Sequence, residues 1–177
     1  MRTSQLRDVL DYVLPCTYVK TFNVLAYDLF DPVDINKFPA AFILNTAKHN
    51  HPGIHWVGLF YKSVKESYFF CSYGKSVQFY GFKNIKPKKW NKRRYQSYDS
   101  NKCGHFAFIF IHQLSLGVSF ENTLKIFHKN SIKNDAIVQK YIIKVYKLKN
   151  QRKAKSDQTC VSLRAFKHEY HSKHVRF

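Results

Sequence analysis

The sequence predicts an α+β fold in which a central, mostly antiparallel sheet packs against a buried helix. Two β-rich runs, residues 54–61 and 67–72, flank the short polar segment 62–66, as in two antiparallel strands joined by a turn. The run 106–111 is too apolar for a surface helix and too short to cross a membrane, so it indicates a helix buried against these strands. A last stretch, 131–146, has the helical spacing of apolar residues that a covering helix needs.

The chain on either side of the strand pair supplies further elements. Residues 4–14 predict a helix with Ser4 as N-cap and Pro15 ending it, and its apolar face consists of Leu6, Val9, Leu10 and Val13. Residues 40–45 predict a short buried strand or a helix turn. Residues 77–82 predict another short aromatic strand.

The buried helix is expected to begin near Cys103. Ser100 or Asn101 is available as its N-cap, and Gly117 is placed to end it. A cysteine at the start of a helix lies at the positive end of the macrodipole, which favours a reactive thiolate. The commoner alternative is a cysteine packed as a small hydrophobe, and Cys103 alone does not decide between the two.

Two helices are predicted to follow. Ser119 is a candidate N-cap for a helix through Phe127, and the helix over 131–146 directs five apolar residues inward, namely Ile137, Val138, Tyr141, Ile142 and Val145. From residue 147 the apolar pattern stops and basic residues dominate. We therefore expect one domain over 1–146 and a flexible basic tail over 147–177, which serves as a nuclear address, as a nucleic-acid anchor or as neither.

The net charge points to an anionic partner. Thirty Lys and Arg face eleven Asp and Glu, which gives a formal net charge of +19. Such an excess of one sign suits nucleic acid first and an anionic membrane surface second. A biased base composition of the genome is nearly as good an explanation, because Lys, Asn, Phe, Tyr and Ile are enriched together.

The cysteines and the first residues indicate an intracellular protein that is neither secreted nor held in a membrane. The four cysteines, at positions 16, 71, 103 and 160, show neither CxxC nor zinc-finger spacing. The first residues contain no apolar signal region, and no apolar run is long enough to span a bilayer. We expect no metal site, because the acids Asp28, Asp31 and Asp34 suit turns and the loop histidines His49 and His51 lack a third fixed ligand.

A basic segment, residues 83–94, is the candidate nucleic-acid contact. It mixes cations with an aromatic side chain, a combination that suits phosphate contact and base stacking. The candidate residues are Lys86, Lys88, Lys89, Trp90, Lys92, Arg93 and Arg94. A solvated charged loop is the alternative, and Pro87 excludes a continuous helix here.

Three residues together outline a cysteine peptidase. Cys103 is a candidate nucleophile, and His55 opens the first β-rich run. Gln96 precedes the cysteine by seven positions and carries an amide that can donate to an oxyanion. A cysteine with a distant histidine is by itself a weak signal.

The strand pair adds a fourth residue to this group. Antiparallel pairing about the turn places His55 opposite Cys71, with His55, Val57 and Leu59 on one face and Trp56 on the other. A register slip of one residue moves a serine, Ser72, toward the histidine instead.

Five short motifs follow one another in an order that resembles a known family. They are Asn45-Thr46-Ala47, His55-Trp56, Phe70-Cys71-Ser72-Tyr73-Gly74, Gln96-Ser97 and Cys103-Gly104-His105. In this order they are similar to the adenovirus protease (adenain) family and its relatives in Polinton/Maverick DNA transposons. These proteins belong to the superfamily of ubiquitin-like-protein-specific cysteine proteases. The resemblance covers about residues 20–145 and implies a papain-like fold whose buried helix carries the nucleophile.

The resemblance also implies the roles of the site residues. By this match Cys103 is the nucleophile, His55 the base and Gln96 the oxyanion donor, supported by the backbone at Gly104. Trp56, Ser72 and Asn45 neighbour the substrate groove. The family has an acid where this chain has Cys71, which predicts a weakened peptidase. Two thiols flanking one histidine also raise the alternatives of a Cys71–Cys103 disulfide or adventitious zinc binding.

The function implied by the resemblance is that of a cysteine endopeptidase cutting after small residues such as glycine. Its substrates are structural precursors of a virus-like element or conjugates of ubiquitin-like proteins, which places it in the nucleus or in a virus-like particle. No cofactor is required, and DNA is a plausible activator because of the positive charge. The alternative is a degenerate peptidase that survives as a basic domain binding nucleic acid or protein. The oligomeric state is left open.

Overall fold

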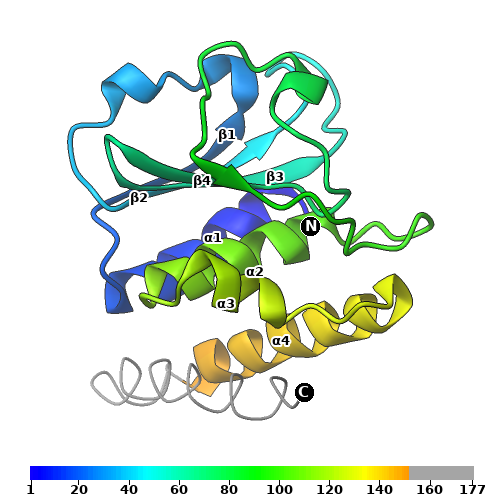
Figure 1. The fold of residues 1–177 in the computed structure, drawn as a ribbon. Coiled ribbons are helices and arrows are strands. Elements are labelled where there is room, and N and C mark those ends of the chain that lie inside the picture. Colours follow the sequence, from blue (N-terminus) through cyan, green and yellow to red (C-terminus); the bar gives the residue numbers. More distant parts are fainter. Residues whose placement is uncertain (152–177) are drawn as a thin grey trace.

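The computed structural model describes residues 1–151 and has a five-stranded sheet with helices on one face (Figure 1). Along the sheet lie β1 (Thr21–Ala26), β2 (Ala40–Asn45), β3 (Trp56–Ser63), β4 (Glu66–Phe70) and β5 (Lys89–Trp90). The inner pairs β2–β3 and β3–β4 are antiparallel, whereas the outer pairs β1–β2 and β4–β5 are parallel. The predicted α+β class is confirmed, but the sheet is mixed rather than mostly antiparallel.

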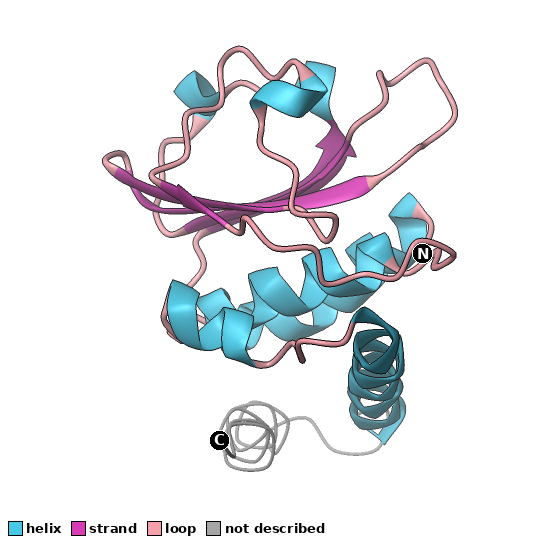
Figure 2. Ribbon diagram, turned by 45° about the vertical axis from the view of Figure 1, so that its right-hand side comes forward, coloured by secondary structure: helices cyan, strands magenta, loops and turns pink. Residues whose placement is uncertain are grey.

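The helices form a layer whose centre is α2. They are α1 (Thr3–Val13), α2 (Cys103–Ser115), α3 (Phe120–Lys125) and α4 (Ser131–Gln151). Helix α2 contacts β2 and β3 as well as the other three helices, so it lies between the sheet and the rest of the layer. The other face of the sheet is covered by loops and short 3₁₀ turns, as Figure 2 shows.

Two hydrophobic cores lie on opposite faces of the sheet. Along β3, Trp56 and Phe60 belong to the core on the helical side. Val57 and Leu59 belong to the core under the loops, together with Cys71. This alternation is the one that the sequence predicts for β3, because successive side chains of a strand point to opposite faces.

The helix ends agree with the sequence only in part. Ser119 caps α3 as predicted, accepting a hydrogen bond from the Asn122 N–H. Gly117 follows α2 with a positive φ of 79°, as expected of the residue that ends the helix. The N-cap of α1 is Arg2 rather than Ser4, and that of α2 is Lys102 without a side-chain cap.

Two further predictions about elements are corrected. Residues 77–82 contain a 3₁₀ turn, Gln78–Tyr80, instead of a strand, because the left-handed residue Gly81 (φ 71°) reverses the chain. Helix α4 runs through Gln151 and not to residue 146, since the apolar Leu148 still packs against the helical core. The predicted domain boundary therefore falls inside a helix, and residues 152–177 of the proposed tail lie outside the described residues.

Candidate active site

His55 and Cys71 meet at one end of the central strand pair. His55 immediately precedes β3 and Cys71 immediately follows β4, and these strands are antiparallel, so both residues reach the same end of the sheet. The Cys71 Sγ lies 3.5 Å from His55 Nε2. The predicted approach of the two side chains is confirmed.

The register of this strand pair differs from the predicted one by two residues. Ser63 pairs with Glu66 across a two-residue turn, and not across the whole segment 62–66. Cys71 is consequently diagonal to His55 rather than directly opposite. Because side chains alternate with period two, a shift of two residues keeps both on the same face, whereas a shift of one would have separated them.

Two tyrosines complete the surroundings of His55: Tyr73, which belongs to the motif over 70–74, and Tyr80, which belongs to none. The Tyr73 ring stacks on the imidazole with 4.8 Å between ring centroids, and the Tyr80 ring lies 6.0 Å away. The Tyr80 hydroxyl lies 3.0 Å from Cys71 Sγ, so the thiol has partners on two sides. Tyr80 belongs to the 3₁₀ turn Gln78–Tyr80, in a segment that was predicted to be a strand. Tyr80 was therefore not predicted to lie near His55.

Burial sets the protonation states of this group. It lowers the pKa of His55 to about 4, because the charged imidazolium loses hydration, so the imidazole is neutral at pH 7. Burial also raises the pKa of the Cys71 thiol, although the hydrogen bond with Tyr80 opposes that effect. A neutral thiol therefore stands where a triad would have a carboxylate, and it gives the imidazolium no charge to pair with.

Cys103 is the first residue of α2 and is only partly buried. It lies within electrostatic reach of the tyrosines around His55: burial raises the pKa values of Tyr73 and Tyr80, and negative charge at Cys103 raises them further. No hydrogen bond joins Cys103 to His55 among the described residues, and none involves His55 Nδ1. Catalytic hydrogen bonds are often formed only when substrate binds, so the missing hydrogen bond does not rule out a nucleophile and its base.

Gly104 allows the start of α2 to lie against the strand that follows His55. A Cβ atom at this position would lie 3.3 Å from Trp56 Cδ1 and 3.2 Å from Met1 Cβ. A larger residue would push the helix away from Trp56. Within residues 1–151 the N–H groups of Cys103 and Gly104 have no acceptor, whereas that of His105 donates to the Lys102 carbonyl, so the first two remain available to an anion.

Gln96 is fully buried and held at both ends of its amide. Its Oε1 accepts a hydrogen bond from the Ser72 hydroxyl at 2.6 Å, and its Nε2 donates to the Ser100 carbonyl at 2.6 Å. One hydrogen of the amide nitrogen is thus in use and the second is left for another acceptor. Ser72 is itself fully buried and supports Gln96 rather than lining an open groove.

Asn91 is a further residue of the site that the sequence did not reveal. Its Oδ1 accepts from the Cys71 N–H at 2.9 Å, and its Nδ2 donates to the Cys71 carbonyl at 2.7 Å. The same nitrogen donates to the carbonyl of Arg93 at 2.8 Å. Asn91 therefore fixes the backbone that carries Cys71, and it lies within a segment whose basic residues drew attention instead.

Asn45 and Trp56 line a cavity of about 420 Å³ beside the start of α2. Its walls include the end of β1, the first turn of α1 and the loop over 48–53. Asn45 is 6% exposed and Trp56 is 9% exposed, so both contribute mainly one edge to this cavity. Ser72 does not line it.

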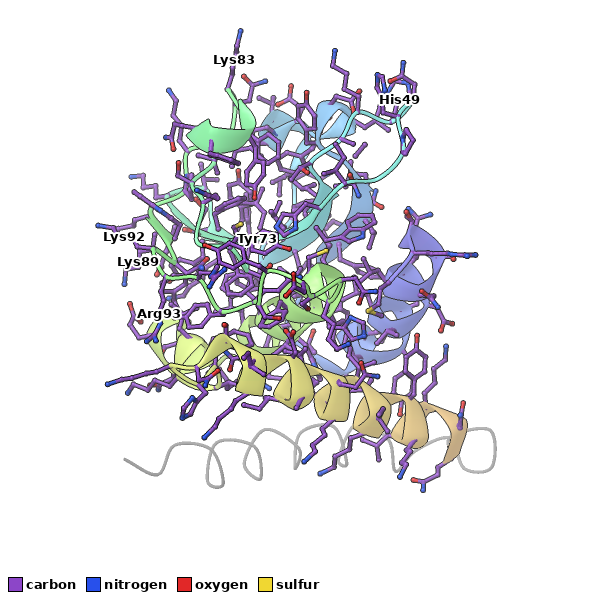
Figure 3. All side chains as sticks on the ribbon, turned by 90° about the vertical axis from the view of Figure 1, so that its right-hand side faces the viewer. His49, Tyr73, Lys83, Lys89, Lys92 and Arg93 are labelled. Atoms are coloured by element: carbon purple, nitrogen blue, oxygen red, sulfur yellow. The ribbon has the colours of Figure 1, made fainter. Side chains whose placement is uncertain are left out.

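The basic segment runs along the edge of the sheet. Figure 3 shows Lys89, Lys92 and Arg93 pointing outward, with Tyr73 nearer the centre of the molecule. Lys89 pairs with Glu121 at 2.7 Å, and Arg93 donates to the Lys129 carbonyl at 2.7 Å. Two of the basic side chains predicted to contact nucleic acid, Lys89 and Arg93, therefore already make contacts within the protein.

The aromatic groups of this segment are also partly engaged. Trp90 is 37% exposed, with Lys92 Nζ 5.6 Å from its ring centroid. The Arg94 guanidinium lies 3.4 Å from the ring centroid of Tyr98. Lys86 and Lys88 make no ion pair within residues 1–151. An exposed ring flanked by cations remains available for stacking.

No group of three or more His, Cys, Asp and Glu side chains within residues 1–151 is arranged to hold a metal ion. His49 instead pairs with Asp28, with 2.8 Å between Nδ1 and Oδ2. Among the described helices, none combines the length and the apolar character needed to cross a bilayer.

No model of a known protein family matches the chain, and a comparison with curated proteins finds no match.

Proposed function

We propose that this chain is a cysteine endopeptidase of the adenain-like type, with Cys103 as nucleophile and His55 as base. The observation that carries the proposal is the neutral imidazole of His55, held between Cys71 and two tyrosines within electrostatic reach of a cysteine that begins a helix. His55, Cys71 and Cys103 are far apart in the sequence, and they are residues that the motif resemblance selects. A papain-like arrangement of helix and sheet is part of the same proposal.

In this mechanism His55 takes the proton of Cys103, and the thiolate attacks the carbonyl carbon of the scissile peptide bond. The carbonyl oxygen becomes an oxyanion, which accepts hydrogen bonds from the Cys103 backbone N–H and from the second hydrogen of the Gln96 amide. Collapse of the tetrahedral intermediate expels the amine, which takes the proton from His55 and leaves a thioester on Cys103. Water then attacks this thioester, with His55 as base, and releases the acid product.

The role of Cys71 explains why the activity should be weak. His55 Nε2 faces the thiol of Cys71, which leaves Nδ1 for the nucleophile. A carboxylate would orient the ring and stabilise its positive form, but a thiol orients it weakly and supplies no charge. A cysteine enzyme depends less on this acid than a serine enzyme, because the helix terminus also favours the thiolate.

The substrate class follows from the resemblance: peptide bonds after small residues such as glycine, in structural precursors of a virus-like element or in ubiquitin-like conjugates. DNA as an activator and a location in the nucleus or in a virus-like particle belong to the same proposal. The net charge of +19 supports the DNA contact.

The test is the cleavage of a mixed peptide library under reducing conditions, with and without duplex DNA. We expect the native protein to cut and the Cys103→Ala variant, prepared identically, to be inactive. Alkylation by iodoacetamide, mapped by mass spectrometry, should modify Cys103 well before Cys71, which is fully buried. Cleavage that persists in Cys103→Ala would refute the nucleophile assignment.

A second function, that of a catalytically degenerate domain binding nucleic acid, is favoured by the missing acid and by the exposed Trp90 with Lys92 beside it. This function predicts that the protein binds DNA tightly and that the logarithm of the binding constant falls steeply with the logarithm of the salt concentration. It also predicts that the native protein cleaves no peptide. Replacing Trp90 with Ala should weaken binding to single strands, and Tyr18→Ala, which removes another exposed aromatic ring at no change in net charge, serves as the matched control.

A further inference from the structure

The cavity beside α2 combines an apolar wall with polar and basic side chains. Leu25, Leu29 and Trp56 form the apolar part. Trp56 is the residue against which Gly104 packs, so the cavity opens next to the helix end that carries Cys103. A peptide held at Cys103 therefore has this cavity within reach of a neighbouring residue.

Asn45 presents a fixed hydrogen-bond donor to the cavity. Its Oδ1 accepts two backbone N–H groups, from Ala47 at 2.9 Å and from Ile54 at 3.2 Å. These two donors fix the orientation of the amide, because the nitrogen could not replace the oxygen there. Asn45 Nδ2 makes no hydrogen bond within residues 1–151, although the residue is 6% exposed.

Gly53 keeps this donor uncovered. A Cβ atom at Gly53 would lie 2.7 Å from Asn45 Nδ2, so any other residue here would displace the amide. Gly53 also lines the cavity. A buried residue that lines the cavity and has a spare N–H matches a ligand with an acceptor oxygen.

The charge around this donor selects an anionic acceptor. Arg2 and Lys48 line the cavity together with His51, and no acidic residue lines it in the described part of the chain. Asp28 lies at its rim through its pair with His49, which is itself a lining residue. The apolar wall is unsuited to a bare phosphate but accommodates the methylene groups of an acidic side chain.

We propose that this cavity is a subsite for a carboxylate of the peptide substrate, bound by Asn45 Nδ2 and by the charges of Arg2 and Lys48. The proposal rests on the peptidase function and specifies its substrate: a peptide in which an Asp or Glu side chain, or a free C-terminal carboxylate, lies near the scissile bond. Both sources present the same group, and the probes below separate them.

Binding measured on Cys103→Ala tests the subsite without relying on cleavage. The probes are acetylated Gly-Gly peptide amides that carry Glu, Asp, Gln or Asn at one flanking position, and acetyl-Leu-Gly-Gly with either a free or an amidated C-terminus. Calorimetry should give about tenfold tighter binding for Glu or Asp than for the matched amide, or for the free C-terminus than for its amide, at low salt. The side-chain NH₂ signal of Asn45 should shift on binding.

Matched variants locate the effect. Asn45→Asp retains the oxygen that accepts the two backbone N–H groups but replaces the donor with an anion, so the preference for acidic probes should be lost. Lys48→Glu should reduce that preference several-fold, whereas Lys140→Glu, which changes the net charge equally at an exposed position on α4, should not.

Three results would overturn the subsite. The first is that acidic and amide probes bind equally tightly. The second is that Lys48→Glu and Lys140→Glu lose the preference for acidic probes to the same extent. The third is that duplex DNA binds at Asn45 more tightly than any of the peptides. A preference for acidic probes in a protein that never cleaves them would leave the subsite standing and remove the peptidase assignment instead.

Discussion

Replacing Cys71 with Asp should raise the peptidase activity proposed for this site. The substitution places a carboxylate beside His55 Nε2, where the thiol sulfur now lies at 3.5 Å. At that distance and an effective dielectric of about 20, attraction between carboxylate and imidazolium reaches about 5 kcal/mol, equivalent to about 3.5 pKa units. This upper limit would move the pKa of His55 from about 4 to near neutrality.

The higher basicity of His55 then determines the gain, because a stronger base takes the Cys103 proton more readily and the imidazolium that forms is more stable. With a pKa of about 4, only about one molecule in a thousand carries the charge, whereas a pKa near 7 gives about half. Reorganisation around a buried carboxylate reduces this advantage, so we expect kcat/KM to rise by about 10- to 100-fold. Because His55 must be neutral to take the Cys103 proton, the acidic limb of the activity profile should lie at higher pH in Cys71→Asp than in the native protein.

The assay is the pH dependence of peptide cleavage together with the rate of iodoacetamide reaction at Cys103, read from the mass of its peptide. Cys71→Asn is the matched control, because it offers a hydrogen bond of similar shape without the charge. The reasoning is refuted if Cys71→Asp and Cys71→Asn give the same pH profile, or if the aspartate variant is folded and no more active than the native chain.

Three further predictions concern stability. Gly74→Ala should lower the free energy of unfolding by about 3 kcal/mol, because φ is 72° and the new Cβ would lie 2.7 Å from a backbone carbon. Gly81→Ala, with φ 71° and nothing within 4 Å of the new Cβ, should lower it by only about 1 kcal/mol. Urea unfolding of both variants checks this difference, and equal losses would contradict it. Asn91→Ala should cost roughly 3 kcal/mol in the same assay, since it leaves the N–H and carbonyl of Cys71 without their buried partner, and a loss under about 1 kcal/mol would mean that water replaces the amide. The pKa of His112 is lowered by burial to about 3, so in the folded protein it stays neutral while the unfolded chain gains a proton below about pH 6.5; stability should fall on acidification from pH 7 to 5, and the loss should be about 2 kcal/mol smaller in His112→Leu, with an unchanged loss arguing against this residue.

The strand pair could be predicted from sequence because its signal is local. The alternation along β3 and the short polar turn determine which side chains share a face. The predicted register was wrong by two residues, but such a shift leaves the same side chains on the same face. The approach of His55 to Cys71 was therefore predictable even though the pairing was not. The buried face of α1 was predictable for the same reason, from helical spacing alone.

The rest of the site depends on loops whose paths carry no periodic signal. Tyr80 reaches Cys71 only because Gly81 turns the chain after a 3₁₀ turn, and a run of aromatic residues gave no hint of that reversal. Asn91 lies among lysines and arginines, so its composition suggested a solvated surface, although the residue itself is 2% exposed. Buried polar residues in such loops become visible only when their hydrogen bonds are known.

The two cores on opposite faces of the sheet have a mechanical consequence. Cys103 packs with the helical core, whereas Cys71, Tyr73 and Tyr80 pack with the core under the loops. The candidate nucleophile and the residues around its base thus pack in different hydrophobic cores. Among the described residues, no hydrogen bond joins Cys103 to His55. A small displacement of the helical layer relative to the loops would therefore change the separation of Cys103 and His55. A substrate of the proposed peptidase that contacted both layers at once would draw Cys103 and His55 together.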